Sequence, residues 1–255
     1  MKQKPGFPAR LPGSAPAPAP RRATASAPLT THAAPAGIGL DSQAVRSRMV
    51  HKLAAQGIKD ARVLAAMNSV ERHRFVDSAL VNQAYEDTSL PIGLAQTISK
   101  PSVVARMIEL LLAGRTGADG RLGRVLEVGT GCGYQAAVLS QVATEVYSIE
   151  RLRGLHERAR ENLRAFRLAN VHLLFGDGMA GFAKGAPYAG IIAAAGGEAV
   201  PAAWTDQLAE GGRIVAPMVM PHGQQALVIV EKSGGTLRQS VLEGVHFVPL
   251  KSGIA

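Results

Sequence analysis

The sequence has only one cysteine, Cys132, among its 255 residues. A single cysteine cannot form an intrachain disulfide, and it excludes a metal site built mainly from cysteines. The histidines show no metal-ligand spacing either, so we expect no bound metal ion. No apolar run approaches the roughly 20 residues that a membrane helix needs. Lys2 and Lys4 are not followed by the apolar stretch of a secretory signal. These absences predict a cytoplasmic protein that has no membrane anchor.

Positive charge is distributed unevenly along the chain. The formal net charge is +9, and residues 1–40 contain five basic residues and no acid, so the remaining residues carry +4. A nucleic-acid-binding domain concentrates its positive charge on a folded face or motif. The distribution therefore gives no reason to expect a specific nucleic-acid partner.

The first 38 residues differ in composition from the rest. They are rich in Pro, Ala, Ser and Thr and hold 8 of the 15 prolines. Such a segment buries too little apolar surface to offset the entropy lost on ordering. We predict a disordered tail over residues 1–38, either a passive extension or a weak electrostatic tether to acidic partners. One folded domain is predicted over residues 39–255.

From residue 124 onward, apolar strand patterns alternate with helical patterns. Helices are expected at 134–143, 152–166 and 201–208, and strands at 124–128, 145–149, 171–175, 188–194 and 213–219, with two late strands at 226–232 and 241–248. Short connections between alternating elements predict a doubly wound α/β fold with a mostly parallel sheet. The last two strands have no helix between them and predict an antiparallel edge. Residues 39–101 add N-terminal helices, at 41–57 and after Asp60, and residues 102–255 form the sheet.

The pattern is organised around Val125–Tyr134, which reads as a strand, a glycine-rich turn and the start of a helix. Glycine permits positive φ and lets a ligand approach bare backbone. In an open α/β sheet, ligands lie outside the carboxyl ends of the strands. Glu150 and Asp177 close the next two strands. An acid in the position of Glu150 can accept hydrogen bonds from both hydroxyls of a ribose.

The glycine spacing favours one class of nucleoside ligand. Gly129, Gly131 and Gly133 form G-x-G-x-G, whereas dinucleotide enzymes use G-x-G-x-x-G to admit a pyrophosphate. Glu127 precedes the turn, and a carboxylate there repels phosphate and suits a cation. S-adenosylmethionine carries an amino group and a sulfonium but no phosphate. The alternative for Glu127 is a buried structural acid.

A polar stretch at 85–101 shows no clean period and is predicted to be a loop. It places Thr97 and Ser99 just before a helix that starts near Pro101. Hydroxyl groups there can hold a carboxylate. On spacing alone, helix capping by Ser99 is the favoured interpretation.

Four segments together resemble the protein-L-isoaspartate O-methyltransferase family. They are residues 90–93, 96–99, 125–134 and 247–250, and the resemblance runs from about residue 42 to residue 255. It implies a Rossmann-like methyltransferase domain and a reaction that uses S-adenosylmethionine. The acceptor would be the α-carboxylate of L-isoaspartyl residues in damaged proteins, and the methyl ester would start their repair through a succinimide. We also expect a monomer.

The resemblance assigns roles to residues of this chain. Ser99 matches the active-site serine of the family, with Thr97 beside it as a second catalytic hydroxyl. Cofactor binding is implied for the glycine loop and the strand ends: Glu127, Gly129, Thr130, Gly131, Gly133, Glu150, Asp177 and Gly178. Substrate binding is implied for Ile98, Val245, Phe247, Val248 and Pro249. The chain departs from the family pattern at Ala189 and at residues 195–198.

Two other functions stay open at this point. One is a methyltransferase of the same fold with a different acceptor, such as a small acid or RNA. The altered residues 188–198 and the basic tail favour that reading. The other is a non-catalytic protein that binds the cofactor and interacts through its proline-rich tail, against which the Thr97–Ser99 segment argues.

Overall fold

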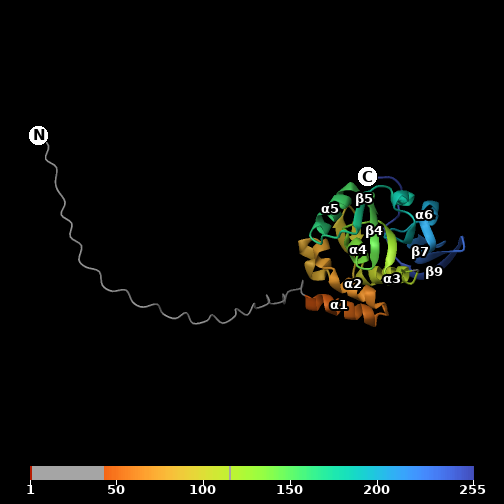
Figure 1. The fold of residues 1–255 in the computed structure, drawn as a ribbon. Coiled ribbons are helices and arrows are strands. Elements are labelled where there is room, and N and C mark those ends of the chain that lie inside the picture. Colours follow the sequence, from red (N-terminus) through yellow and green to blue (C-terminus); the bar gives the residue numbers. More distant parts are fainter. Residues whose placement is uncertain (2–42, 115) are drawn as a thin grey trace, which may run out of the picture. The chain divides into compact units, whose positions relative to one another are not determined.

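The computed structural model describes Met1, residues 43–114 and residues 116–255. Apart from Met1, the predicted tail lies outside the described residues, so its boundary near residue 38 stays a prediction. Figure 1 shows the described part as a central sheet with helices packed against it. No helix among these residues is both long and apolar enough to cross a membrane. They also contain no group of three His, Cys, Asp or Glu side chains that could hold a metal ion.

Seven strands form the main sheet. Their bounds are β3 (Leu122–Val128), β4 (Ala143–Glu150), β5 (Val171–Phe175), β6 (Tyr188–Ala193), β7 (Leu208–Val219), β8 (Gln225–Ser233) and β9 (Thr236–Val245). The order is β5-β4-β3-β6-β7-β8-β9, parallel from β5 to β7 and antiparallel for β7/β8 and β8/β9. The predicted fold class and its antiparallel edge are confirmed. The strand order reverses between β3 and β6, which is where such folds bind ligands.

Helices cover both faces of the sheet because its central strands are apolar on both sides. Val125 and Leu126 are neighbours on β3, both fully buried, and they belong to two different hydrophobic clusters. The first cluster includes residues of α3 (Pro101–Leu112), α4 (Tyr134–Leu139) and α5 (Arg153–Arg164), and the second includes Trp204 of α6 (Ala202–Gln207). Burial on both faces explains why the strand is a continuous apolar run, as is typical of parallel sheets covered by helices on both sides.

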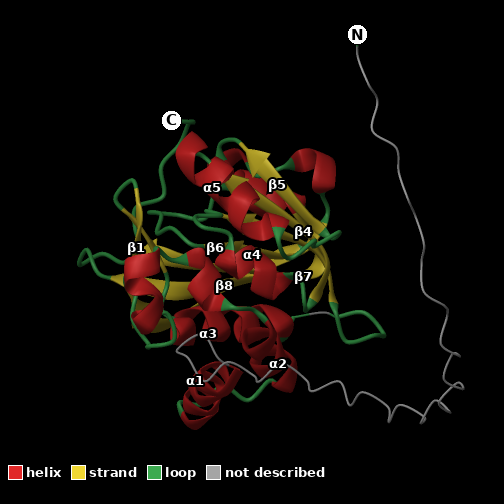
Figure 2. Cartoon of the chain, turned by 90° about the vertical axis from the view of Figure 1, so that its left-hand side faces the viewer, coloured by secondary structure: helices red, strands yellow, loops and turns green. Residues whose placement is uncertain are grey.

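The N-terminal part packs beside α3 (Figure 2). It comprises α1 (Gln43–Ala55), α2 (Ala61–Ser69), two 3₁₀ turns (Arg72–Phe75 and Ser78–Gln83), and the antiparallel pair β1 (Leu90–Gly93) and β2 (Gln96–Ile98). The prediction of a polar loop at 85–101 was wrong at residues 90–93 and 96–98, which form these strands. Strands of three or four residues are too short to show a clear alternation. The signal was present in the buried Leu90, Ile92 and Ile98.

Several boundaries differ from the predicted ones, and β9 also starts five residues earlier than predicted, at Thr236. Helix α4 ends at Leu139, because the next amides form tighter turns. Strand β7 already starts at Leu208, and the predicted turn at 211–212 lies inside it beside a register shift. Strand β9 ends at Val245, because the backbone of Phe247 bonds to the side chain of Gln225 instead of a neighbouring strand.

Candidate active site

The glycine turn leaves the end of β3 in left-handed backbone conformations. Gly129, Gly131 and Gly133 have φ values of 91°, 57° and 91°. The permissiveness of glycine is therefore required at all three positions. A Cβ on Gly133 would lie 3.0 Å from Leu163 Cδ1, so this glycine lets α5 pack closely. Only Gly129 and Gly131 line the pocket outside the turn.

Glu150 closes β4 and holds the turn in place. Its Oε2 accepts a hydrogen bond from the Gly131 amide at 2.9 Å, and its Oε1 accepts one from the Leu152 amide at 2.9 Å. The residue is only 5% exposed but still lines the pocket. Each carboxylate oxygen can accept a second hydrogen bond. Glu150 therefore both shapes the turn and presents acceptors to a ligand.

A cavity of about 400 Å³ lies outside the turn, and we call it the glycine-turn pocket. Besides Gly129, Gly131 and Glu150, its walls include Gly178. The Gly178 carbonyl accepts a hydrogen bond of 2.8 Å from the buried Trp204 indole. A Cβ on Gly178 would lie 2.4 Å from Val128 Cγ1, so the turn after β5 needs glycine there. This pocket falls within the size range of small-molecule sites.

Four residues predicted to bind the cofactor are not part of the wall of this pocket: Glu127, Thr130, Gly133 and Asp177. The Asp177 carboxylate bonds to the amides of Met179 and Gly253 at 2.8 and 2.7 Å. Thr130 is buried, and its Oγ1 lies 2.6 Å from Ser148 Oγ. Of the eight residues predicted to bind the cofactor, only Gly129, Gly131, Glu150 and Gly178 line the pocket.

Glu127 lies beneath the turn in a closed polar cluster. Its side chain is fully buried, and its Oε2 accepts a hydrogen bond from the Ser148 hydroxyl. Its Oε1 has no hydrogen-bond partner. Burial raises the pKa of Glu127 to about 8, against the opposing effect of the Ser148 hydrogen bond. At neutral pH the side chain is therefore largely protonated, and the surroundings match the structural alternative. Direct contact between Glu127 and a cofactor stays a prediction.

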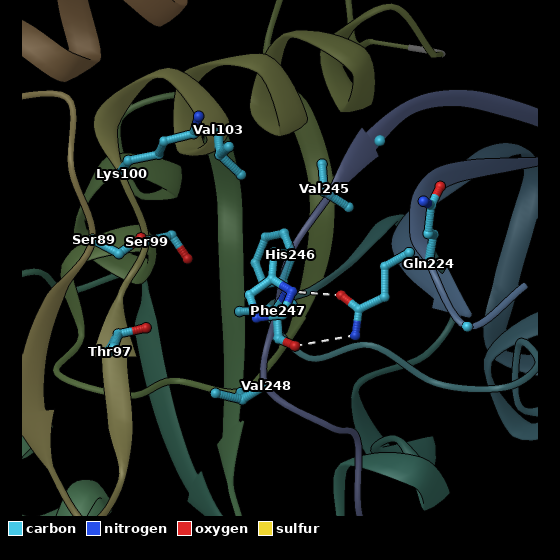
Figure 3. A pocket seen from close by; sticks show the side chains of 14 residues that line it. Ser89, Thr97, Ser99, Lys100, Val103, Gln224, Val245, His246, Phe247 and Val248 are labelled. Atoms are coloured by element: carbon cyan, nitrogen blue, oxygen red, sulfur yellow. Dashed lines mark hydrogen bonds between the residues drawn. The ribbon is translucent and has the colours of Figure 1, made fainter. Parts of the chain in front are cut away.

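A second cavity, of about 670 Å³, lies beside Ser99, and we call it the serine cleft. Thr97 and Ser99 line it (Figure 3). Neither side chain is hydrogen-bonded within the described part of the chain. The capping interpretation of Ser99 was wrong, because the N-cap residue of α3 is Lys100, which makes no side-chain cap. Asp87 instead accepts a hydrogen bond from the Ser102 amide at 2.8 Å.

The opposite wall of the serine cleft follows β9. Val245, Phe247 and Val248 line it, as their predicted role requires. The side chain of Gln225 on β8 accepts from the Phe247 amide at 2.7 Å and donates to the Phe247 carbonyl at 3.1 Å. Figure 3 draws both bonds. These two bonds hold Phe247, and the residues after it are held by backbone hydrogen bonds between Gly196 and both Val248 and Leu250.

Ile98 and Pro249, the other predicted substrate residues, lie elsewhere. Ile98 is 4% exposed and packs in the hydrophobic core, and it also lines a small cavity of about 40 Å³ between Ser99 and the glycine turn. Pro249 lines the glycine-turn pocket. The structure therefore brings together only part of the predicted substrate set.

The two cavities meet at Thr97, Ala194 and Val248, which line both the glycine-turn pocket and the serine cleft. Thr97 and Ala194 also line a smaller cavity of about 40 Å³ between Ser99 and the glycine turn. A group held in one cavity can therefore approach a group held in the other at this junction.

Sequence reasoning missed several residues of the site. Lys100 lines the serine cleft, and its ammonium forms no ion pair with a described residue. Gln225 and Ser148 act through hydrogen bonds to Phe247 and Glu127. Gln225 and Ser148 belong to no sequence motif that would mark them as site residues. Lys100 could have been noticed, because it directly follows Ser99.

The reversed strand order, the glycine turn and the acid at the end of β4 define a Rossmann-like methyltransferase. The family model of protein-L-isoaspartate(D-aspartate) O-methyltransferase (PCMT) matches residues 44–255. The chain belongs to this family.

Individual relatives agree with the family match. The protein-L-isoaspartate O-methyltransferase of Methylibium petroleiphilum is 62% identical over 221 residues, covering 86% of this chain and 81% of the relative. The one from Burkholderia lata is 58% identical over 224 residues, covering 87% and 71%. A solved protein-L-isoaspartate O-methyltransferase is 28% identical with a TM-score of 0.73, covering 82% of this chain and 67% of its own. A Plasmodium falciparum protein solved with S-adenosyl-L-homocysteine is 22% identical with a TM-score of 0.69, covering 81% and 98%, and shows the shared fold.

Proposed function

We propose that this protein transfers a methyl group from S-adenosyl-L-methionine to the α-carboxylate of L-isoaspartyl residues in damaged proteins and peptides. The observation that carries the proposal is the junction at Thr97 and Ala194. There a nucleoside-sized pocket opens into a cleft lined by the unpaired hydroxyl of Ser99. Membership of the family supports the same acceptor. The resulting ester would cyclise to a succinimide and so start repair.

The glycine-turn pocket fits the cofactor. Glu150 uses one acceptor site of each carboxylate oxygen on the protein backbone and keeps another for ribose hydroxyls. Gly129 and Gly131 expose backbone without side chains. When bound, S-adenosyl-L-methionine supplies an electrophilic methyl group on a sulfonium. We assign Gly129, Gly131, Glu150 and Gly178 to its binding.

The chain's own residues then have a simple task in the reaction. An α-carboxylate is ionised at neutral pH, so no general base is needed. Thr97 and Ser99 donate hydrogen bonds to one carboxylate oxygen and leave the other directed at the junction. Val245, Phe247 and Val248 exclude water from the cleft, which favours a step that neutralises charge. Alignment of this kind can remove on the order of 7–11 kcal/mol of the barrier.

The proposal also covers the oligomeric state and the cellular compartment of the enzyme. We propose that the enzyme acts in the cytoplasm. We also infer that it acts as a monomer, because one chain supplies the residues that line both cavities. Sedimentation at working concentration, with activity measured across a dilution series, tests this. Activity per chain that falls on dilution would contradict it.

One assay tests the main proposal. The protein is incubated with methyl-labelled S-adenosyl-L-methionine and two peptides that differ only in isoaspartate against aspartate. We expect base-labile label on the isoaspartyl peptide alone. Binding of S-adenosyl-L-homocysteine without transfer to either peptide would reject the acceptor while keeping the cofactor. Transfer to a small acid or to RNA instead would support the alternative acceptors.

A further inference from the structure

Strand β5 forms one edge of the main sheet, at the opposite end of the strand order from β9. In a parallel pair, alternate residues of a strand direct both backbone groups to the neighbouring strand. The Gly176 amide donates to the Glu150 carbonyl of β4 at 3.0 Å, so the even-numbered residues of this stretch face β4. The backbone N–H and C=O groups of Val171 and Leu173 therefore point outward, where they have no partner among the described residues.

The sequence of β5 does not protect this edge. Proteins usually protect an exposed edge strand with a proline, a lysine or a β-bulge. Residues 171–175 contain neither proline nor lysine, and their pairing with β4 has no register shift. An unprotected edge can accept an extended segment of another chain as an added strand.

A cavity of about 400 Å³ lies beside the edge, between β5 and the end of α5, and we call it the edge groove (Figure 1). Apolar side chains contribute to its lining: Leu163, Leu168, Val171 and Leu173. Val171 and Leu173 are two residues apart, so their side chains lie on the same face of β5. A strand added at this edge would place every second side chain over the edge groove.

Three exposed arginines line the same groove: Arg160, Arg164 and Arg167. None of them forms an ion pair with a described residue. No described acidic residue lines the groove, although Glu157 and Glu161 lie on the same helix. Arg160 and Arg164 are one helical turn apart, and like charges at that spacing repel each other. A ligand that carries carboxylates relieves this repulsion, so the edge groove favours an acidic partner.

We propose that the edge groove binds an extended acidic segment of a partner protein, which adds to β5 as a further strand and places its carboxylates beside the three arginines. Backbone hydrogen bonds to the open edge supply affinity, and the arginines supply the preference for acidic sequences. The serine cleft lies at the β8/β9 side of the sheet, so this docking site is separate from the site of methyl transfer. The proposal does not depend on the proposed function.

Three other occupants fit the groove less well. Residues 2–42 of this chain contain five basic residues and one acid, so their charge opposes binding to the arginines. A second copy of the chain, paired through β5 about a two-fold axis, would bring two sets of arginines together. RNA would lack stacking partners, because no described aromatic side chain lines the groove.

The test uses a fluorescein-labelled octapeptide of alternating valine and glutamate. We expect it to bind the full-length protein in fluorescence anisotropy at low salt, and we expect the matching valine–lysine peptide not to bind. Amides of alternate residues in a strand point to opposite edges, so either the valine or the glutamate amides would face β5. N-methylation of that set should raise the Kd at least about tenfold, and N-methylation of the other set should raise it much less.

A charge-reversal pair tests the arginines. Arg160→Glu with Arg164→Glu should raise the Kd of the valine–glutamate peptide about 5- to 30-fold. Arg48→Glu with Lys52→Glu is the matched control, because it makes the same change in charge at the same spacing on the exposed face of α1. The control should stay within twofold of the parent. Both double variants should keep the parent kcat/KM for a short isoaspartyl peptide.

Hydrogen exchange locates the bound peptide. Binding should slow exchange of the amides of Val171 and Leu173 and leave those of His172 and Leu174 unchanged. Absence of peptide binding, unchanged exchange at Val171 and Leu173, or equal losses in the two double variants would overturn the proposal. Tighter binding of a ten-residue oligouridylate at the same arginines would overturn it in favour of RNA. A failure of methyl transfer to isoaspartyl peptides would reject the proposed function and leave these readouts intact.

Discussion

The two cavities of the site are built in different ways. The glycine-turn pocket relies on backbone and on Glu150, whose carboxylate is already bonded to two amides. The serine cleft presents side chains that are unpaired among the described residues, such as Ser99, Thr97 and Lys100. The wall of the cleft at residues 246–248 lies beyond the end of β9 and is held by Gln225.

The difference teaches where each half can tolerate change. A change at Glu150 removes internal contacts and ligand contacts together, because the same atoms serve both. A change at Ser99 removes only contacts with the acceptor. Mutations in the glycine-turn pocket should therefore change ligand affinity and protein stability, whereas mutations in the serine cleft should change turnover alone.

The largest effect is expected for Glu150→Ala. The variant leaves the amides of Gly131 and Leu152 without their acceptor and removes the acceptors offered to the ribose. Hydrogen bonds to charged groups contribute about 1.5–3 kcal/mol each. We expect the Kd for S-adenosyl-L-homocysteine to rise at least about 100-fold by calorimetry, together with a lower Tm. Glu150→Gln keeps one acceptor oxygen, so its Kd and its Tm should lie between those of the parent and those of Glu150→Ala. A Kd within threefold of the parent would remove Glu150 from the binding site.

Ser99→Ala sharpens the comparison from the other side. Losing one hydrogen bond to a carboxylate costs about 1.5–3 kcal/mol, so kcat/KM for an isoaspartyl peptide should fall about 10- to 100-fold. The Kd for S-adenosyl-L-homocysteine and the Tm should stay unchanged. Thr97→Val is the companion variant for the second hydroxyl. Unchanged turnover in Ser99→Ala would take the serine off the catalytic list.

Glu127→Gln tests the buried cluster beneath the glycine turn. The raised pKa of about 8 means that the folded protein keeps a proton that the unfolded chain, with an ordinary pKa near 4.5, releases. The stability of the parent should therefore fall as the pH rises from about 5 to 8. Glutamine mimics the protonated acid and should remove that slope. Thermal unfolding of both proteins between pH 5 and pH 9 measures it. Parallel curves would show that Glu127 does not titrate in this range.

The smallest effect is expected for Lys100→Gln. The cleft side chain is exposed, and exposed charge pairs contribute about 0.2–1 kcal/mol. Peptides with an acidic residue beside the isoaspartate should lose at most about fivefold in kcat/KM, and neutral peptides should not change. The difference should vanish at high salt. Lys100→Arg is the control that keeps the charge. Equal losses on acidic and neutral peptides would indicate a steric effect.

Much of the fold could be predicted from the sequence because its signals are local. Alternating apolar strands and helices gave the parallel sheet, and the spacing of Gly129, Gly131 and Gly133 gave a turn with positive φ. The hairpin of β1 and β2 was missed because its strands are too short to show a period. The end of β9 was misplaced because its limit depends on Gln225, a residue from another strand.

The glycine-turn pocket was predictable where a motif and a strand end coincide. Gly131 and Glu150 met that condition, and both line the pocket. Asp177 met it as well, yet its carboxylate bonds to Gly253, a contact between residues 76 apart that no local pattern reveals. For Glu127, burial favours a structural acid over a carboxylate that contacts the cofactor. The sequence shows the type of a residue but not its solvent exposure, so this could not be predicted.

The hydrogen bond from the Ser102 amide to Asp87 has a consequence for how this enzyme can diverge. Asp87 lies outside helix α3 and accepts a hydrogen bond from the Ser102 amide in the first turn of that helix. Residue 99 is therefore not needed as a helix cap. Selection on mutations of Ser99 then acts through the reaction with the acceptor and not through the stability of the fold. A lineage could replace the serine and explore new acceptors without first acquiring compensatory mutations, provided that Asp87 is kept.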